Sequence, residues 1–336
     1  MDIAQLSHDL TQGDRRALAR AITLVESARP DHRAQALELL TALPPRPALR
    51  IGLTGTPGVG KSSFIEAFGL MLTGLGHKVA VLAVDPSSAR TGGSILGDKT
   101  RMERLSREPR AFIRPSPARA ELGGVARRTR EAVTLCEAAG FDVVLIETVG
   151  VGQSETVVAA LCDVFLLLLA PAGGDELQGV KRGIMEMADL LLVNKADGDL
   201  LPQAQRTLAD YAGALRLMRP RPQDPEDFPA ALTVSATEGR GLTEAWEAIG
   251  RLTHWRKEQG HFDRTRADQA RHWFAQEVRE GLLSVLLRPD VAERMAALAD
   301  QVARGRPPEA AAADLLNGGL LAKLSRSALD LASDSA

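Results

Sequence analysis

Apolar side chains recur at helical spacing through the first part of the chain. Over residues 6–25 they fall on one face of a single expected helix, and residues 36–40 predict a second helix after Pro30. Prolines at positions 44, 45 and 47 end this pattern. We therefore expect an N-terminal helical extension over residues 1–48.

A different pattern, in which short apolar runs alternate with amphipathic stretches, follows up to about residue 252. Several runs are continuously apolar, as expected for strands that helices cover on both faces. The expected strands are residues 50–54, 79–84, 111–114, 143–147, 164–169, 190–193 and 232–234. The alternation predicts an α/β domain over residues 49–260, with a mostly parallel, doubly wound sheet.

Beyond residue 253 the pattern is helical. Pro289 interrupts it, and Asp290 is expected to cap the next helix. An apolar stripe precedes the break, at Trp273, Phe274, Val278, Leu282, Val285 and Leu286. Because such a stripe needs a partner, residues 261–336 are predicted to form a helical dimerisation arm and the protein a homodimer. Packing of the stripe on the chain's own α/β domain is the alternative.

Composition narrows the class of protein. The 336 residues carry a formal net charge of −2 and 4% aromatic side chains, so neither electrostatics nor base stacking favours a nucleic-acid or membrane partner. Cys136 and Cys162 are expected to be buried thiols, since two isolated cysteines make no disulfide framework. No signal peptide or membrane-spanning run is recognised, which favours a cytoplasmic location.

A phosphate-binding motif, GxxxxGK[ST], lies between an expected strand and an expected helix. Backbone N–H groups of such a loop and the following helix N-terminus converge on phosphate. Lys61 is expected to reach the β- and γ-phosphates, and the Ser62 hydroxyl to bind Mg²⁺. The expected nucleotide contacts are Gly55, Thr56, Pro57, Gly58, Val59, Gly60, Lys61, Ser62 and Ser63.

An Asn-Lys-Ala-Asp segment, residues 194–197, follows another apolar run. The Asp197 carboxylate can accept hydrogen bonds from both N1 and N2 of guanine, and adenine lacks that pair of donors. Asn194, Lys195 and Asp197 are therefore predicted to bind guanine. After the last expected strand, Ser235, Ala236 and Thr237 fit the loop whose backbone contacts the base.

Further acids are expected at the same edge of the sheet. Glu147 ends a strand at the position of many GTPase Asp-x-x-Gly motifs, with Gly150 at the γ-phosphate; a solvent-facing acid is the alternative. Asp85 ends a neighbouring strand, where ligands bind in open α/β sheets. Asp98 closes a glycine-rich loop and is expected near Mg²⁺ or the attacking water, or else as a helix N-cap.

Residues 173–182 form a polar, glycine-bearing segment between an apolar strand and a helix. The acidic side chains of this segment would be stabilised at a helix N-terminus, so one interpretation is that the segment caps the following helix. A catalytic role is the other interpretation: Gln178 would orient water or phosphate, and Lys181 would supply a cation.

Together these motifs resemble the MeaB/ArgK/MMAA family, the GTPase chaperones of adenosylcobalamin-dependent methylmalonyl-CoA mutase. The resemblance covers most of the chain and rests on the segments GTPGVGKSS, VDPSS, GGSILGDKTRM, ETVGVGQSE, GGDELQGVKRGIMEMAD and NKAD. It implies GTP/GDP and Mg²⁺ as cofactors and GTP hydrolysis as the reaction.

The resemblance also implies residue roles and partners. It places Ser62, Asp85, Asp98 and Glu147 around the metal and the water, and Gln178 and Lys181 in a switch that responds to a client. The implied client is a cobalamin-dependent acyl-CoA mutase, with methylmalonyl-CoA mutase favoured and an adenosyltransferase as a further candidate partner. A homodimer through the C-terminal arm is implied as well.

Other nucleotide-binding classes fit less well. A metallochaperone GTPase would need a Cys/His cluster, which the two separated cysteines do not make. A partition ATPase would carry a second lysine where this chain has Thr56, and a signal-recognition GTPase would bring a Met-rich domain. A kinase of a transport protein would use the same phosphate loop, and transfer of labelled phosphate to protein would distinguish it.

Overall fold

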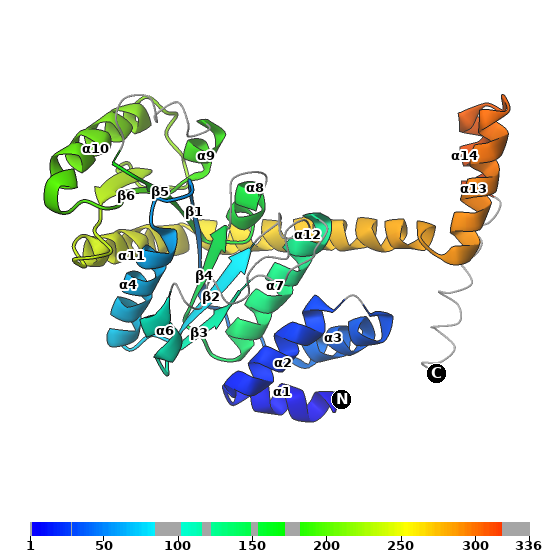
Figure 1. Ribbon diagram of the computed structural model, residues 1–336, viewed down its shortest axis with the longest axis horizontal. Helices are drawn as coiled ribbons and strands as arrows, with labels where there is room; N and C mark the ends of the chain where they lie inside the picture. Colours follow the sequence, from blue (N-terminus) through cyan, green and yellow to red (C-terminus); the bar gives the residue numbers. More distant parts are fainter. Residues whose placement is uncertain are drawn as a thin grey trace. The chain divides into compact units, whose positions relative to one another are not determined.

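The computed structural model describes residues 2–27, 29–84, 102–115, 122–148, 154–171 and 182–317 (Figure 1). Its contacts divide the chain into two compact units, Met1–Arg266 and Ala267–Ala336. The first unit holds the sheet. No helix among the described residues has both the length and the apolarity that crossing a membrane requires.

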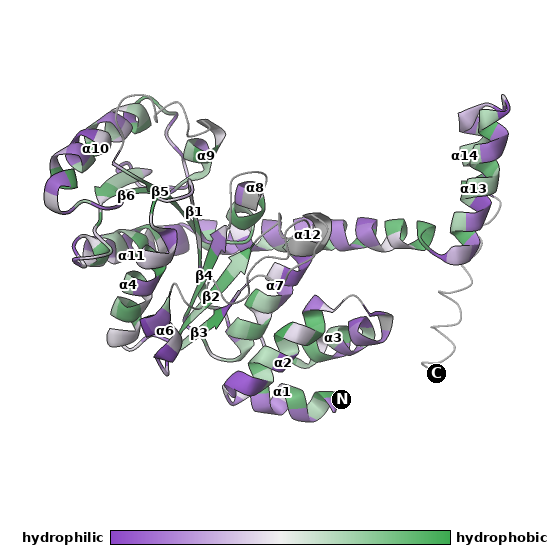
Figure 2. Cartoon of the chain, viewed as in Figure 1, coloured by the Kyte–Doolittle hydropathy of each residue, from purple (hydrophilic) through white to green (hydrophobic). Residues whose placement is uncertain are grey.

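A seven-stranded sheet forms the centre of the first unit, in the order β3-β2-β4-β1-β5-β6-β7. All six strand pairings are parallel, which confirms the predicted α/β class. Figure 2 shows the strands as largely hydrophobic, and every residue of β2, β4 and β5 is buried. The strands are β1 (Leu49–Gly55), β2 (Val79–Val84), β3 (Ala111–Arg114), β4 (Val143–Thr148), β5 (Val164–Leu169), β6 (Leu190–Val193) and β7 (Ala230–Thr233).

Successive strand residues point to opposite faces of the sheet, and helices cover both faces. Ile51 and Leu53 of β1 belong to a buried cluster with Phe64 and Phe68 of α4 and with residues of α11. Gly52, between them, faces the other side, where a Cβ would lie 2.9 Å from Val158 of α8. The helices of this unit that follow β1 are α4 (Lys61–Gly74), α6 (Glu103–Arg107), α7 (Leu122–Ala138), α8 (Ser154–Ala159), α9 (Arg182–Met187), α10 (Leu201–Arg216), α11 (Leu242–Glu258) and the start of α12 (His261–Leu286).

The N-terminal extension contains three helices, α1 (Ile3–Thr11), α2 (Arg15–Glu26) and α3 (Pro30–Ala42). The prediction of one helix over residues 6–25 is wrong, because Gly13 takes a φ of +83° and ends the first helix. The Asp14 carboxylate then accepts hydrogen bonds from Arg16 N at 2.6 Å and Ala17 N at 2.9 Å and so caps α2. The second helix packs against α7.

The described part of the second unit is helical, as the sequence pattern indicates. Beyond the rest of α12 it contains α13 (Pro289–Ala303) and α14 (Pro308–Leu315), which pack together. The prediction that Asp290 caps α13 is wrong: Arg288 holds the N-cap position, and Pro289 and Asp290 lie in the first turn. A proline suits the first helical position because its missing N–H would have no partner there.

Candidate nucleotide-binding site

The expected phosphate-binding segment connects β1, the strand flanked by β4 and β5, to α4. From β1 the chain continues to β2 on one side, whereas the later strands β5, β6 and β7 lie on the other side. Open α/β sheets bind ligands where the strand order reverses in this way. Gly55 and Gly60 have φ values of +158° and +91°. A Cβ on Gly60 would lie 2.7 Å from Asn194 Nδ2, so the loop passes this side chain too closely for any other residue.

Lys61 is the first residue of α4, and its ammonium turns back over the loop. Nζ donates hydrogen bonds to Gly55 O at 2.7 Å and Thr56 O at 3.2 Å. Burial lowers the pKa of Lys61, and the negative charges of Glu147 and Glu155 oppose that shift. A cation that is partly buried at a helix N-terminus is suited to binding phosphate oxygens.

Asn194 joins the segment after β6 to the phosphate loop. Its Nδ2 donates to Val59 O at 2.9 Å, and its Oδ1 accepts from Ala236 N at 3.3 Å. Lys195, at a φ of 59°, donates from Nζ to Gly58 O at 2.7 Å. Three loops that are far apart in the sequence are therefore fastened to one another.

The expected base-binding residues lie on the same two loops. The Ser235 hydroxyl donates a hydrogen bond to the Asp197 carboxylate and accepts one from Glu238 N at 3.0 Å. Asp197 is thus held beside the loop that contains Ala236 and Thr237. A carboxylate fixed in this way keeps lone pairs on both oxygens, which can accept from the paired N–H donors of a base.

Glu147 lies near the end of β4, opposite Leu53 of β1 in the parallel register. It is 5% exposed, so it is not the solvent-facing acid of the alternative interpretation. The next residue, Thr148, donates from its hydroxyl to Thr54 Oγ1 at 2.9 Å and ties the two strand ends together. The Glu147 carboxylate lies close enough to the phosphate loop for its charge to act on the Lys61 ammonium.

Several expected site residues lie outside the described residues: Asp85, Asp98, Gly150, Gln178 and Lys181. The described chain before these segments ends at or just after β2, β4 and β5, and it resumes at or just before α6, α8 and α9. Val84, the last residue of β2, pairs with Thr148, the last residue of β4, so the described chain ahead of this segment ends beside the end of β4. Ser62 and Ser63 are described and lie in the first turn of α4.

Sequence reasoning gave no separate role to Glu155 or to the hydroxyl pair of Thr54 and Thr148. Glu155 is buried in the first turn of α8, and its charge acts on the Lys61 ammonium. The sequence signal for Glu155 was its place in the ETVGVGQSE segment. The contact between Thr54 and Thr148 joins side chains 94 residues apart, and no local sequence pattern predicts it.

Both cysteines are buried and free of disulfide bonds. Burial raises the pKa of each thiol above its ordinary value. Cys162 Sγ would lie 2.9 Å from a Cβ on Gly52, so this thiol fills space between α8 and β1. Neither thiol has the thiolate character that reactivity requires.

Residues 18–289 match the family model described as methylmalonyl Co-A mutase-associated GTPase MeaB. The chain is 55% identical to a putative GTPase of Caulobacter vibrioides, covering 94% of this chain and 97% of that protein. It is 46% identical to the mitochondrial methylmalonic aciduria type A homolog of Mus musculus, covering 94% of this chain and 78% of the mouse protein.

A solved structure described as a LAO/AO transport system kinase has a similar fold and sequence. The TM-score is 0.71 at 38% identity, and the likeness covers 94% of this chain and 96% of that one. The names of these similar proteins thus include two activities, GTP hydrolysis and kinase.

Proposed function

Because the chain belongs to the MeaB family of methylmalonyl-CoA mutase-associated GTPases, we propose that its hydrolysis of GTP serves a cobalamin-dependent acyl-CoA mutase. Methylmalonyl-CoA mutase is the favoured client. The single observation that carries the proposal is the family match over residues 18–289. The role is that of a chaperone, which couples loading, protection or reactivation of the mutase cofactor to the nucleotide state.

The chain's own residues have separate tasks in the reaction. The loop between β1 and α4 binds the phosphates through backbone N–H groups, and Lys61 adds positive charge. Asp197, supported by Ser235, selects guanine. Phosphoryl transfer depends mainly on such positioning and on neutralising charge, so these groups supply what the reaction needs.

Mg²⁺ fits the oxygen donors on this side of the sheet. The Ser62 hydroxyl in the first turn of α4 and the Glu147 carboxylate beside the phosphate loop are hard ligands of the kind that Mg²⁺ prefers. The sequence adds Asp85 and Asp98 to this set. When bound, the ion would neutralise charge on the β- and γ-phosphates.

The client proposal is tested through the catalytic candidates in residues 173–182. GTP turnover is measured with and without purified methylmalonyl-CoA mutase, for the parent and for Lys181→Ala. We expect similar basal rates, stimulation of the parent, and loss of that stimulation in the variant, because Lys181 supplies charge in the client-bound arrangement. One supplied cation is worth roughly 10³–10⁵ in rate in related reactions.

The controls of that experiment separate the proposals. Ethylmalonyl- and isobutyryl-CoA mutases replace the favoured client in parallel assays, and an adenosyltransferase is tested in the same way. Full stimulation of Lys181→Ala would rule out its assigned role and leave residues 173–182 as a capping segment ahead of α9. Absence of stimulation by every mutase would contradict the client proposal.

A kinase is the second candidate, favoured by the name of the similar solved structure. GTP labelled at the γ-phosphate distinguishes the two activities. A GTPase releases labelled inorganic phosphate, whereas a kinase transfers the label to a protein side chain. We expect free phosphate.

We also propose that the protein is a homodimer through its C-terminal helices. Phe274, Val278 and Leu282 follow one another at intervals of four residues on α12, which places them on one face. Phe274 is 72% exposed and Leu282 is 49% exposed. Apolar surface of this kind on a helix favours a partner.

A further inference from the structure

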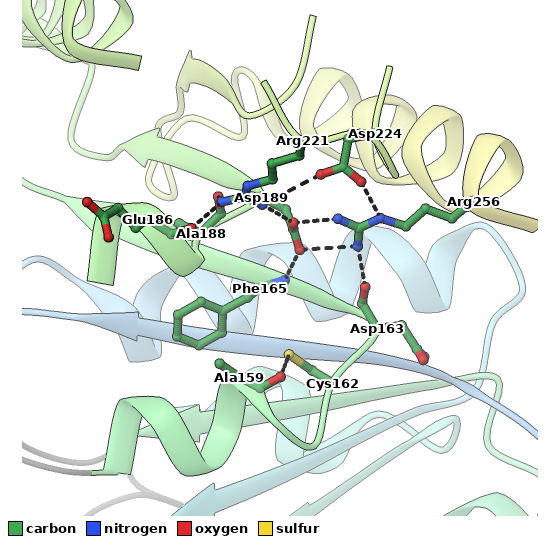
Figure 3. A network of polar contacts seen from close by, with 10 residues as sticks. All are labelled: Ala159, Cys162, Asp163, Phe165, Glu186, Ala188, Asp189, Arg221, Asp224 and Arg256. Carbon is green, nitrogen blue, oxygen red and sulfur yellow. Dashed lines mark hydrogen bonds and ion pairs between the residues drawn. The ribbon is translucent and has the colours of Figure 1, made fainter. Parts of the chain in front are cut away.

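A buried network of charged side chains lies where strands β5 and β6 begin (Figure 3). This is the end of the sheet opposite the expected nucleotide-binding loops. Asp163 immediately precedes β5, and Asp189 immediately precedes β6. Because the strands are parallel, these two residues mark the amino ends of strands whose carboxyl ends approach the nucleotide. Arg256 of α11 and Arg221, from the connection between α10 and β7, complete the centre of the network.

Arg256 holds the network together. Its guanidinium donates to Asp189 Oδ1 at 2.6 Å, to Asp224 Oδ1 at 2.7 Å and to Asp163 O at 2.7 Å. Burial lowers the pKa of Arg256, but Asp189 and Asp224 outweigh burial and raise this pKa above its ordinary value. Asp189 also accepts from Phe165 N at 2.8 Å. These bonds fix Asp189 without any contribution from Arg221.

Arg221 has a different task, since it reaches beyond the carboxylates to a helix end. Its Nη1 donates to Asp189 Oδ1 at 2.9 Å, and its Nη2 donates to Glu186 O at 2.6 Å and to Ala188 O at 2.8 Å. Those carbonyls lie at the C-terminal end of α9, where a helix has unsatisfied acceptors and partial negative charge. Arg221 therefore caps α9 and anchors it to the fixed carboxylate of Asp189.

The position of α9 matters for the chemistry because of what it contacts. It packs against β5 and against α8. The first turn of α8 presents Glu155, whose charge acts on the Lys61 ammonium. A helix of six residues has little stability of its own, so its end contacts decide where it lies.

We propose that Arg221 is a positioning residue for GTP hydrolysis. It fixes α9 from the end of the sheet at which β5 and β6 begin. Through the packing of α9 on α8, it keeps Glu155 in position relative to Lys61 at the opposite end. The loops that bind the nucleotide itself are fastened separately, by Asn194 to Val59 and by Lys195 to Gly58. Loss of the Arg221 contacts therefore slows the chemical step and leaves GTP affinity unchanged. The inference concerns the chain alone and does not depend on a client.

The test compares Arg221→Ala with two controls. Arg219→Ala removes an exposed arginine from the same connection. Arg256→Lys weakens the network through a residue with no bond to the α9 carbonyls in the described contacts. Four quantities are measured for each: the single-turnover rate of GTP hydrolysis, the GTP dissociation constant, hydrogen exchange of the amides in residues 183–188, and the unfolding temperature by circular dichroism.

For Arg221→Ala we expect a rate lower by about tenfold, since small misplacements at a catalytic site cost one to two orders of magnitude. The dissociation constant stays within about twofold, because a change confined to the chemical step leaves ground-state binding intact. Exchange in residues 183–188 becomes faster. Arg219→Ala behaves as the parent, and Arg256→Lys lowers the unfolding temperature with hydrolysis retained.

Other outcomes overturn the assignment. An unchanged rate for Arg221→Ala refutes it, and so does a dissociation constant that weakens as much as the rate falls. An equal loss of rate in Arg256→Lys would mean that general network stability, and not the α9 contact, is what matters. If circular dichroism shows that Arg221→Ala does not fold, Arg221→Lys decides: its ammonium retains part of the carbonyl contact, and an intermediate rate supports the proposal while an unchanged rate refutes it.

Discussion

Asp197 and its serine partner show how a single side chain is prepared for recognition. The Ser235 hydroxyl donates to one oxygen of the Asp197 carboxylate, and a carboxylate has further lone pairs on both oxygens that can accept hydrogen bonds from a base. A base with two adjacent N–H donors matches the carboxylate, whereas one without them leaves a polar group unmatched. We therefore propose that base selectivity depends on Asp197 and on the loop that orients it.

Asp197→Asn is expected to weaken GTP binding by about 1–3 kcal/mol, the scale of a hydrogen-bond partner left unmatched. The amide keeps the size of the side chain but offers a donor where guanine also offers donors. Nucleotide titrations of parent and variant with GTP and ATP measure the effect. Ser235→Ala, which removes the orienting hydroxyl and keeps the carboxylate, should give a smaller loss. Equal binding of ATP and GTP by the parent would refute guanine selection.

Lys61→Ala is expected to lower the rate of GTP hydrolysis by at least about a hundredfold and to leave the fold intact, because Lys61 places a positive charge at the phosphates. The Nζ contacts of Lys61 are to two loop carbonyls, so its removal opens no cavity in the core. Released phosphate and circular dichroism are the two measurements, and Lys257→Ala serves as an exposed control. Global unfolding of Lys61→Ala would assign the residue a structural role instead.

At the scale of elements, the strands could be predicted and several connections could not. Strands β2, β4 and β5 are buried on both faces, so their apolar runs are continuous and visible in the sequence. The break between α1 and α2 was missed because both helices carry the same apolar spacing and the turn depends on the φ of one glycine. The motif residues proposed for the site were chosen by type and spacing, and the structure brings Lys61, Asn194 and Asp197 onto neighbouring loops.

The contacts of Arg221 illustrate why the rest was out of reach. Two of its acceptors are backbone carbonyls, 35 and 33 residues away in the sequence. Every residue has a backbone carbonyl, so the side chains at these positions give no sign of the contact. An arginine in a proline-rich connection carries no signal for such a contact. Long-range bonds to backbone atoms become apparent once the strands between them are in place.

The Asp14 cap of α2 gives a prediction that depends on pH. Hydrogen bonds from Ala17 N and Arg16 N lower the pKa of Asp14 from the ordinary value of 3.8. A carboxylate whose pKa is lower in the folded state stabilises that state at any pH above the pKa of the unfolded state. This stabilisation is lost as the pH falls through the pKa of the folded state. Asp14→Ala should therefore unfold at lower urea concentration at pH 7.

The same comparison at acid pH is the control for this cap. The difference in urea midpoint between parent and Asp14→Ala should shrink as the pH falls below 3.8. Asp14→Ser, which retains a capping oxygen without a charge, should keep most of the stability and lose the pH dependence. A difference in midpoint that does not change with pH would show that the charge has no part in capping.

At the scale of the whole molecule, the division into two units bears on assembly. The unit boundary falls within α12, after Arg266. Arg266 belongs to the first unit, where it donates to Asp163 Oδ1 at 2.8 Å and Oδ2 at 2.7 Å. An experiment on the dimer should keep this pair, because removing Arg266 would leave a buried carboxylate without its cation.

A chain that ends after Arg271 is expected to be monomeric, since it lacks the apolar face of Phe274, Val278 and Leu282 and keeps Arg266. Multi-angle light scattering measures the mass. In the full chain, Leu282→Glu should also dissociate the dimer, and Leu217→Glu, at a position 90% exposed in the first unit, should not. A shortened chain that remains dimeric would exclude this face as the interface and favour the alternative that it packs on its own α/β domain.

The order of the strands also has a consequence for synthesis of the protein on the ribosome. Asn194 bonds to a carbonyl 135 residues earlier, and the central strand β1 pairs with strands made long after it. Domains emerge from the ribosome N-terminus first, and contacts between distant segments form late. A nascent chain that stops short of Asn194 already contains the whole phosphate-binding motif, yet it lacks Asn194 and Lys195, which fasten that motif, and the later loop whose Ser235 orients Asp197. If these loops select the nucleotide as proposed, newly made chains are expected to gain that selectivity only when about two thirds of the protein has been translated.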